Sequence, residues 1–358
     1  MRLKFFLSLL ISAIFIFLAF RDIDYKLMLT AFQHANYWWL LPSVLVMFVS
    51  HWLRAVRWRY FMEPIKRVST PVLFAATMIG YYGNNVFPLR AGEVLRAYSI
   101  GKAAGVSRMA SFATIIVERL IDIFSLLLLL AISVGFHDYP AWIEKGAWLL
   151  FFFTAASTVF MVFLMRRTAQ TLLFVERITS PFPQRVRDMV LKLLRSFLEG
   201  FGIFQKSEHF WTIAWQSVAI WLFYTATIYF TLEAFNLNAK FALPVGASFI
   251  ILVMISLGIM VPAAPGYVGT FHWICQQALV LFNVSESESL SFAVIMHISN
   301  FIPVTLVGLY YYYKQQVDFR EAVAGAAGNG DNSSQTLNSS GPSHSLNQPT
   351  TSPSSSHE

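Results

Sequence analysis

Apolar residues run in long stretches along the chain, and short polar segments separate them. Stretches of bilayer-crossing length occupy about 3–20, 37–56, 109–135, 146–165, 210–232 and 290–313. Because a hydrocarbon core of ~30 Å needs about 20 apolar helical residues, the pattern predicts an all-α, polytopic integral membrane protein with six full spans. Residues 3–20 are similar to a signal peptide, but no small-x-small cleavage site follows them, so we expect a retained first helix.

Two further apolar stretches are broken by residues that interrupt helices. The first, 71–88, ends in GNNVFP, and the second, 244–283, contains PAAPGYVG. Unwound backbone at membrane depth persists only where protein or a cavity satisfies its polar groups. We therefore expect two broken or re-entrant helical elements in addition to the spans. Residues 91–105 are more polar than 268–283, which favours an interfacial return in the first element.

The basic residues predict which connectors face the cytoplasm. Lys and Arg precede the first span, follow the second, open the connector at 166–167 and follow the last span at Lys314. Cytoplasmic connectors of membrane proteins carry an excess of Lys and Arg. The N-terminus, the C-terminal tail and the segment from Arg54 to Arg67 are therefore predicted to be cytoplasmic. Residues 136–145 and 284–289 lack this excess and are predicted to lie outside.

Parity then orients the two broken elements. Residues 57–70 and 89–108 are both basic, so the stretch between them should enter from the cytoplasm and return. By the same reasoning, 244–283 should enter from outside, either as a hairpin or as a pair of spans. The predicted domain, 1–321, then divides into halves 1–140 and 141–321 of opposite orientation. Inverted repeats with discontinuous helices are typical of secondary transporters.

Two segments fall outside this pattern. Residues 322–358 are rich in Ser, Gly, Asn and Pro, which predicts a disordered tail. Residues 166–209 contain the amphipathic stretch VRDMVLKLLRSFLEGF, which predicts a helix on the membrane surface.

Charge enters the apolar pattern at the head of the third span. Ile123 to Val134 covers only ~18 Å as a helix, so a spanning helix must include Glu118, Arg119 and Asp122. Each such charge costs roughly 2.5–3.5 kcal/mol at the bilayer centre. Their i,i+3 and i,i+4 spacing predicts a paired cluster on one helix face. The cluster is either a structural ion pair between helices or part of a functional site.

The two breaks supply further candidate residues. In the first, Pro88 and Gly92 end one helix and begin another near Ala91, and a helix start suits a phosphate group. Arg90 and Arg96 could add bidentate contacts; the alternative is a cytoplasmic loop whose arginines only set topology.

The second break has the same composition in Pro262, Pro265, Gly266 and Gly269, with Thr270 placed to cap the next helix and His272 in its first turn. The alternative there is a tight turn between two spans. In the last span, His297, Asn300 and Pro303 form a polar middle.

Composition narrows the function classes. Of the 358 residues only 13% are charged, and the net charge of +7 fits basic cytoplasmic loops and anionic lipid better than nucleic acid. The single cysteine, Cys275, excludes an internal disulfide, and the scattered histidines predict no metal site. Asp22 and Asp24 form an acid-x-acid pattern in a short loop, where a solvated turn is expected, and there is no Walker A motif.

These motifs together resemble the flippase-like transmembrane family of lysylphosphatidylglycerol synthases, which also occurs as stand-alone membrane proteins. The resemblance covers about residues 1–320. N-x-x-P-x-R-x-G-E-x-x-R is met by Asn85, Pro88, Arg90, Gly92, Glu93 and Arg96; E-R-x-x-D by Glu118, Arg119 and Asp122; and P-x-x-P-G-x-x-G by Pro262, Pro265, Gly266 and Gly269. Many members carry Glu where this chain has His272.

The resemblance implies movement of aminoacylated or other phosphate-bearing lipids between leaflets of the cytoplasmic membrane. The 358 residues contain no soluble aminoacyl-transferring domain, which implies the transport half, without enzyme activity or a cofactor. The expected partners are anionic lipids and a lipid-synthesising enzyme. Two alternatives stay open: an intramembrane glycosyl or phospholipid transferase that uses a lipid phosphate, and a scaffold for an envelope enzyme.

Overall fold

The computed structural model describes residues 2–87, 91–134, 167–184, 209–244, 246–259 and 264–326, with parts of 141–159 and 187–195. All regular structure in these residues is helical. The elements are α1 (Arg2–Phe20), α2 (Tyr25–His34), η1 (Tyr37–Trp39), α3 (Leu40–Met62), α4 (Thr70–Val86), α5 (Gly92–Ala104), α6 (Arg108–Val134), α8 (Thr168–Thr179), α10 (Phe210–Ala234), α11 (Leu237–Lys240), α12 (Ala247–Gly258), η5 (Pro265–Tyr267), α13 (Thr270–Val280), α14 (Glu286–Lys314) and α15 (Phe319–Ala326).

Three helices in the described residues have the length and apolar composition to cross a membrane: Tyr37–Met62, Phe210–Ala234 and Glu286–Lys314. Helix α6 is also long enough, at 27 residues, but it carries the three charges noted above. The described residues therefore form an all-helical structure with the long apolar helices of a membrane protein. The predicted span 146–165 falls largely outside the described residues, so the count of six stays a prediction.

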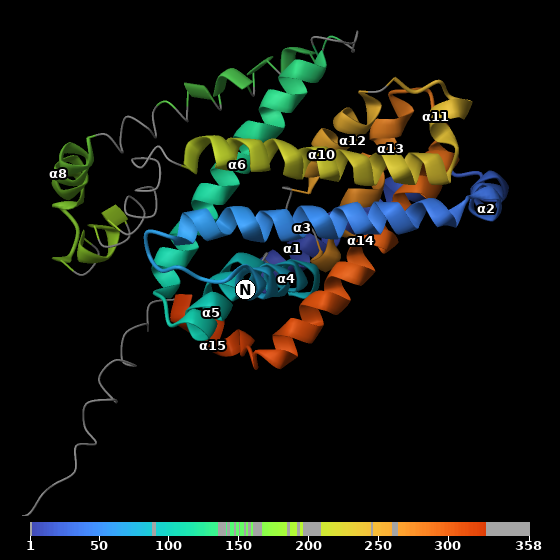
Figure 1. Ribbon diagram of the computed structural model, residues 1–358. Coiled ribbons are helices and arrows are strands. Elements are labelled where there is room, and N and C mark those ends of the chain that lie inside the picture. The colour runs from blue at the N-terminus through green and yellow to red at the C-terminus, as the bar shows by residue number, and fades with distance from the viewer. Residues whose placement is uncertain are drawn as a thin grey trace, which may run out of the picture.

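Helices α3 and α10 pack side by side through the centre of the bundle (Figure 1). They run antiparallel, since Asn36 next to the start of α3 donates its backbone N–H to Ala234 at the end of α10. Farther along, Ser43 donates to the Thr227 carbonyl at 3.0 Å, and Arg57 donates to Ser217 at 2.7 Å. Helix α3 ends at Met62, beyond the predicted 56. This extension carries Arg57 inside the bundle, one helical turn beyond the buried Arg54.

Both predicted breaks separate pairs of packed helices. Helix α4 packs on α5, and α12 packs on α13. The first pair approaches so closely that a Cβ on Gly92 would overlap the Gly80 carbonyl oxygen and the Asn84 side chain. In the second pair, a Cβ on Gly258 would meet the Ile274 side chain. Each break therefore joins a helical hairpin.

The connectors gather at two ends of the bundle. At one end, Lys66 donates to the Ala104 carbonyl at 2.7 Å, and Lys102 donates to the Gln316 carbonyl at 2.6 Å. At the other, Lys240 pairs with Glu288 at 2.5 Å. The three connectors that were predicted to be cytoplasmic for their basic residues thus lie together, away from the acidic 284–289.

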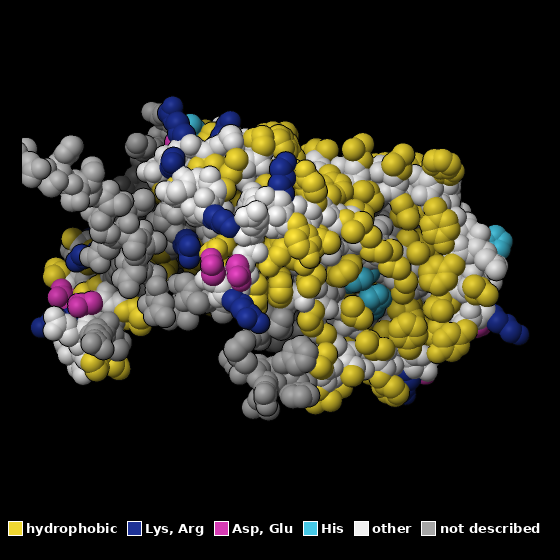
Figure 2. Space-filling model, turned by 90° about the horizontal axis from the view of Figure 1, so that it is seen from below, with side chains coloured by type: hydrophobic (Ala, Val, Ile, Leu, Met, Phe, Trp, Pro, Cys, Tyr) yellow, Lys and Arg dark blue, Asp and Glu magenta, His cyan; other side chains and the backbone are white. Residues whose placement is uncertain are grey.

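The surface is apolar over a wide area. Large exposed side chains on the long helices include Leu41, Leu45, Trp211, Trp215 and Leu306. Figure 2 shows a broad apolar face with Lys, Arg, Asp and Glu side chains gathered mostly toward one end. Soluble monomers rarely expose contiguous apolar patches beyond a few hundred Å², so this surface suits a lipid environment.

Two predicted segments need correction or lie outside the structure. Helix α15 continues to Ala326, and Ala322 is buried, so the predicted tail begins later than 322 because Phe319 anchors the helix by stacking on Phe87. In the connector 166–209, α8 exposes Leu173, Phe174 and Ile178, which fits a surface helix. Most of VRDMVLKLLRSFLEGF lies outside the described residues.

Candidate functional site

A buried cluster of charged side chains joins α3, α5 and α6 near the end of the bundle where the basic connectors meet. Glu118 on α6 is fully buried, and its carboxylate accepts from Arg54 of α3 at 2.8 Å and from Arg96 of α5 at 2.8 Å. Such buried pairs are stable only when geometry and hydrogen bonds offset the loss of water. Glu118 therefore fastens three helices together. We call Arg54, Arg57, Arg96, Glu118 and Asp122 the inner cluster.

Asp122 completes the inner cluster one helical turn away. Its carboxylate accepts from Arg57 at 2.6 Å and from Arg54. Three guanidinium groups thus face two carboxylates, which leaves one positive charge in excess inside the protein. The predicted cluster exists, but α3 and α5 supply its cations.

The arginines of α3 correct the sequence analysis. Arg54 and Arg57 were assigned to a cytoplasmic connector, yet both are buried, at 3% and 0% exposure. They lie three residues apart on a helix that continues to Met62, so both face α6. The spacing of the two arginines in WLRAVRW, flanked by apolar residues, is the sequence signal for a shared buried face.

Arg96 also differs from its predicted role. Its guanidinium turns inward to Glu118 and lies 3.7 Å from the centre of the Trp58 ring, a cation–π contact. Its Nε atom is buried and has no hydrogen-bond partner among the described residues. Arg96 is therefore mainly a member of the inner cluster, with one donor left over.

Arg119 and Glu93 form a looser pair beside the inner cluster, which we call the outer pair. Arg119 Nη2 lies 3.8 Å from Glu93 Oε1, and Nη1 lies 3.8 Å from Asp122 Oδ2. Both distances exceed hydrogen-bonding length. The side chains are 40% and 27% exposed, against 0% for Glu118. The predicted pairing of Arg119 with Asp122 is thus present but weak.

The outer pair lines a small pocket between α4, α5 and α6. Its walls are Thr77, Gly80, Tyr81, Asn84, Gly92, Glu93, Arg96 and Arg119. The free volume is about 10 Å³, room for roughly one water molecule. The Tyr81 hydroxyl lies 3.3 Å from that of Tyr224, which accepts from Arg54 at 3.3 Å. Hydrogen bonds through Tyr81 and Tyr224 therefore connect the pocket wall to Arg54 of the inner cluster.

The first break is organised by the two asparagines before it. Helix α5 begins at Gly92 as predicted, and the Gly92 N–H donates to the Asn84 side-chain oxygen at 2.9 Å. Asn85 donates to Thr305 of α14 at 2.8 Å. One free N–H of the helix start is thus already occupied by protein. Pro88 and Arg90 lie outside the described residues.

The second break carries no ionised side chain in its described part. Gly266 and Gly269 have positive φ of 73° and 87°, which glycine adopts at little cost, and Pro265 starts η5. Thr270 was predicted to cap α13; instead Gly269 holds the cap position, and the buried Thr270 hydroxyl has no partner among the described residues. Pro262 lies outside them.

His272 lies in the first turn of α13, as predicted, but it is not alone. Its ring centre is 4.8 Å from that of His297, which stacks on Phe301 at 5.4 Å. Asn300 donates to the Met296 carbonyl within α14. The polar residues of this half are held by aromatic packing and local hydrogen bonds.

The two breaks meet in space. Helix α4 contacts η5, and a Cβ on Gly266 would lie 3.5 Å from the Asn85 carbonyl oxygen. The described parts of the two predicted site regions are therefore neighbours.

The acid-x-acid residues lie apart from the inner cluster. Asp24 caps α2 by accepting from the Lys26 and Leu27 N–H groups, and Asp22 is exposed beside Arg21. These contacts account for both carboxylates as a helix cap and a surface ion pair.

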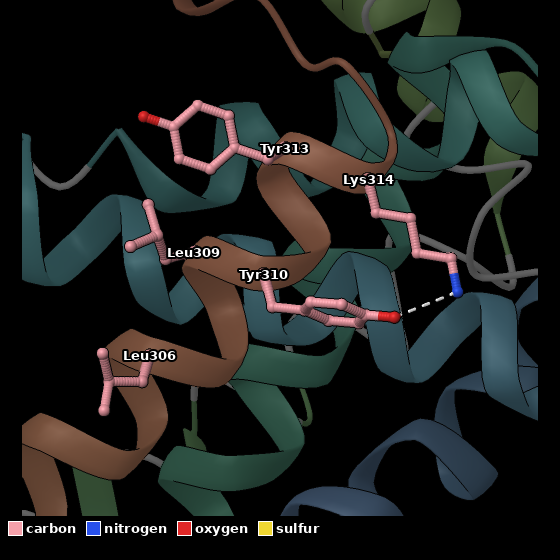
Figure 3. Close-up of a pocket in the computed structure, with 5 residues that line it drawn as sticks. All are labelled: Leu306, Leu309, Tyr310, Tyr313 and Lys314. Carbon is pink, nitrogen blue, oxygen red and sulfur yellow. Dashed lines mark hydrogen bonds between the residues drawn. The ribbon is translucent and has the colours of Figure 1, made fainter.

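Figure 3 shows a shallow groove on α14 in which Lys314 donates to the Tyr310 hydroxyl at 3.3 Å. Such Tyr and Lys residues are typical of the membrane interface.

Comparison with known protein families assigns this chain to one of them. The family model described as the lysylphosphatidylglycerol synthase TM region matches residues 5–308. The chain belongs to this family. The match includes both hairpins, the inner cluster and the outer pair, so the resemblance stated from the sequence motifs is confirmed.

Curated relatives are distant. A glycosyltransferase, AglD, of Haloferax volcanii is 25% identical over 75% of this chain, but the match spans only 47% of that protein. A UPF0104 membrane protein of Methanothermobacter thermautotrophicus is 24% identical over 78% of this chain and 86% of its own length. One of Methanocaldococcus jannaschii is 21% identical over 75% and 82%. No solved structure matches the chain significantly.

Proposed function

We propose that this protein moves a phosphate-bearing lipid, such as an aminoacylated phospholipid or a polyprenyl-phosphate-linked lipid, between membrane leaflets. The observation that carries the proposal is an excess of guanidinium charge inside an apolar helical bundle, next to a pocket lined by Arg119. Guanidinium groups bind phosphate bidentately. The family supports the proposal because its model is named for a lipid-synthase membrane region.

The site in this proposal centres on Arg119. The inner cluster holds the helices and supplies a positive field, while Arg119 and the free Nε of Arg96 contact the head group. Gly92 and Glu93 line the walls of its pocket, Asn85 connects α4 to α14 beside it, and the acyl chains remain in the bilayer. Arg90 keeps its proposed role from the sequence pattern.

We extend the proposal to topology: six spans in two inverted halves, 1–140 and 141–321, in a cytoplasmic membrane with both termini inside. The gathering of the basic connectors at one end supports it. Single cysteines at positions 66 and 102, with Cys275 replaced, should label from the same side of the membrane. Labelling from opposite sides would reject the inverted repeat.

A transferase is the second candidate, because one relative is named a glycosyltransferase. Its support in this chain is small: the match covers 47% of that relative, and the acid-x-acid residues are occupied by capping and surface pairing. The scaffold alternative draws on the tight packing of the inner cluster, which leaves little free space.

Vesicles containing the purified protein test the proposal. A labelled anionic phospholipid should become accessible in the second leaflet faster than in protein-free vesicles, and faster than a labelled lipid without phosphate. Equal rates for the two lipids would exclude recognition of phosphate. A lack of any acceleration, combined with product formation from a sugar or lipid donor, would favour the transferase.

A further inference from the structure

Glu93 is held far less firmly than the other carboxylates near the site. Glu118 accepts guanidinium hydrogen bonds at 2.8 Å from two sides. Among the described residues, Glu93 by contrast accepts only a long 3.4 Å hydrogen bond from Asn84, besides its 3.8 Å approach to Arg119. It lies in the first turn of α5, on the pocket wall. A carboxylate in this position can move away without breaking a strong contact.

Arg119, the cation opposite Glu93, is also held by long contacts. Arg119 has no hydrogen bond of normal length with a described residue, and its Nε is buried without a partner among them. Arginine offers five donors in a planar fork. The most exposed guanidinium of the group therefore carries unused donors that face the pocket beside Glu93.

Space in the pocket sets a further condition. About 10 Å³ is free, which admits roughly one water molecule and no phosphate group. A phosphate therefore fits inside the pocket beside Arg119 only if a wall residue moves, and Glu93 is the wall residue that carries the same sign of charge as phosphate. Its departure opens room and frees Arg119 in one movement.

We propose that the Glu93 carboxylate occupies the place of the substrate phosphate on Arg119, is displaced when the phosphate enters, and expels the phosphate on its return. This inference rests on the proposed function and adds a built-in competitor to it. The competitor keeps Arg119 from being an unpaired charge in the empty protein, and it prevents the phosphate from staying bound.

Glu93→Gln tests the inference because it keeps the shape of the side chain and removes the competing charge. The affinity of the detergent-solubilised protein for inorganic phosphate, measured by calorimetry, should rise up to roughly fivefold, the upper end expected for a partly exposed ion pair. In vesicles, the concentration of labelled anionic phospholipid at half-maximal rate should fall. The maximal rate should fall as well, because release loses its competitor.

Glu63→Gln is the matched control, since it removes the same charge from a glutamate that pairs with Arg67 and not with Arg119. If both variants gained phosphate affinity equally, the gain would come from the change in net charge and not from Glu93 itself. That result would overturn the inference. Unchanged or weaker phosphate binding in Glu93→Gln, with a wild-type protein that binds, would also overturn it. Absence of phosphate binding and lipid movement in the wild type would instead reject the proposed function itself.

Discussion

The two hairpins of this protein have the same construction and opposite chemistry. In each, a helix ends at a Pro/Gly break and a second helix returns beside it, α4–α5 in one and α12–α13 in the other. The first hairpin borders Arg96, Glu118 and the outer pair. The second presents His272, Thr270 and aromatic rings. The first hairpin thus adjoins ion pairs, whereas the described part of the second is held by packing and local hydrogen bonds.

The different surroundings of the two hairpins predict different sensitivities to substitution. Charges buried in pairs are costly to disturb, so substitutions in the first hairpin and the inner cluster should be more damaging than those in the second hairpin or on the surface. If the second hairpin had the same chemistry, its buried polar side chains would need partners, yet the Thr270 hydroxyl lacks one among the described residues. Three pairs of variants can break or sharpen this comparison.

The largest effect is expected for Asp122→Asn. It leaves Arg57 and Arg54 without their shared carboxylate, and breaking a buried pair costs roughly 3–5 kcal/mol. Asp22→Asn, at an exposed position, should change stability by no more than about 0.5 kcal/mol. The melting temperature and the yield of folded protein measure both. Equal results would mean that the inner cluster does not hold the helices.

An intermediate effect is expected for Gly92→Ala. Its new methyl group would strike backbone and the Asn84 side chain, and overpacking costs roughly 1–3 kcal/mol. Gly258→Ala in the second hairpin meets the Ile274 side chain, which can change rotamer, so its cost should be smaller. Thermal unfolding of the two variants gives the comparison. A larger loss at Gly258 would reverse the assignment of the tighter hairpin.

The smallest effects on stability are expected for Asn84→Ala in the first hairpin and Thr270→Val in the second. Removal of the Asn84 cap from the Gly92 N–H should cost about 1 kcal/mol. Thr270→Val keeps the side-chain shape and removes a hydroxyl without a partner among the described residues, so stability should be unchanged or slightly higher. Lipid movement should also persist. Loss of movement in Thr270→Val would give the second hairpin a chemical role.

The sequence predicted much of this fold because long apolar runs and Pro/Gly breaks leave few alternatives. The ends of α1, α6, α10 and α14 agree with the predicted spans within a few residues. The partners of Glu118 were not predicted, because Arg54 comes from α3, 64 positions away, and Arg96 from α5, 22 positions away. No local pattern pairs residues at these separations.

Local rules also misassigned single residues. Thr270 has the residue type of a helix cap, yet the positive φ at Gly269 places the cap one residue earlier. Arg96 follows a helix start that suits phosphate, yet helical periodicity turns it toward Glu118. Side-chain direction thus depended on how α5 packs, which the sequence alone does not specify.

Arg119→Lys tests the central claim most directly. Lysine keeps the charge but loses the planar fork that binds phosphate bidentately, and the long contacts of Arg119 predict little loss of stability. In vesicles, movement of a labelled anionic phospholipid should fall roughly tenfold, the consequence of losing about 1.4 kcal/mol of bidentate binding. Arg67→Lys, at an exposed surface pair, should retain the wild-type rate. Full activity of Arg119→Lys, with normal folding, would contradict the placement of the phosphate on Arg119.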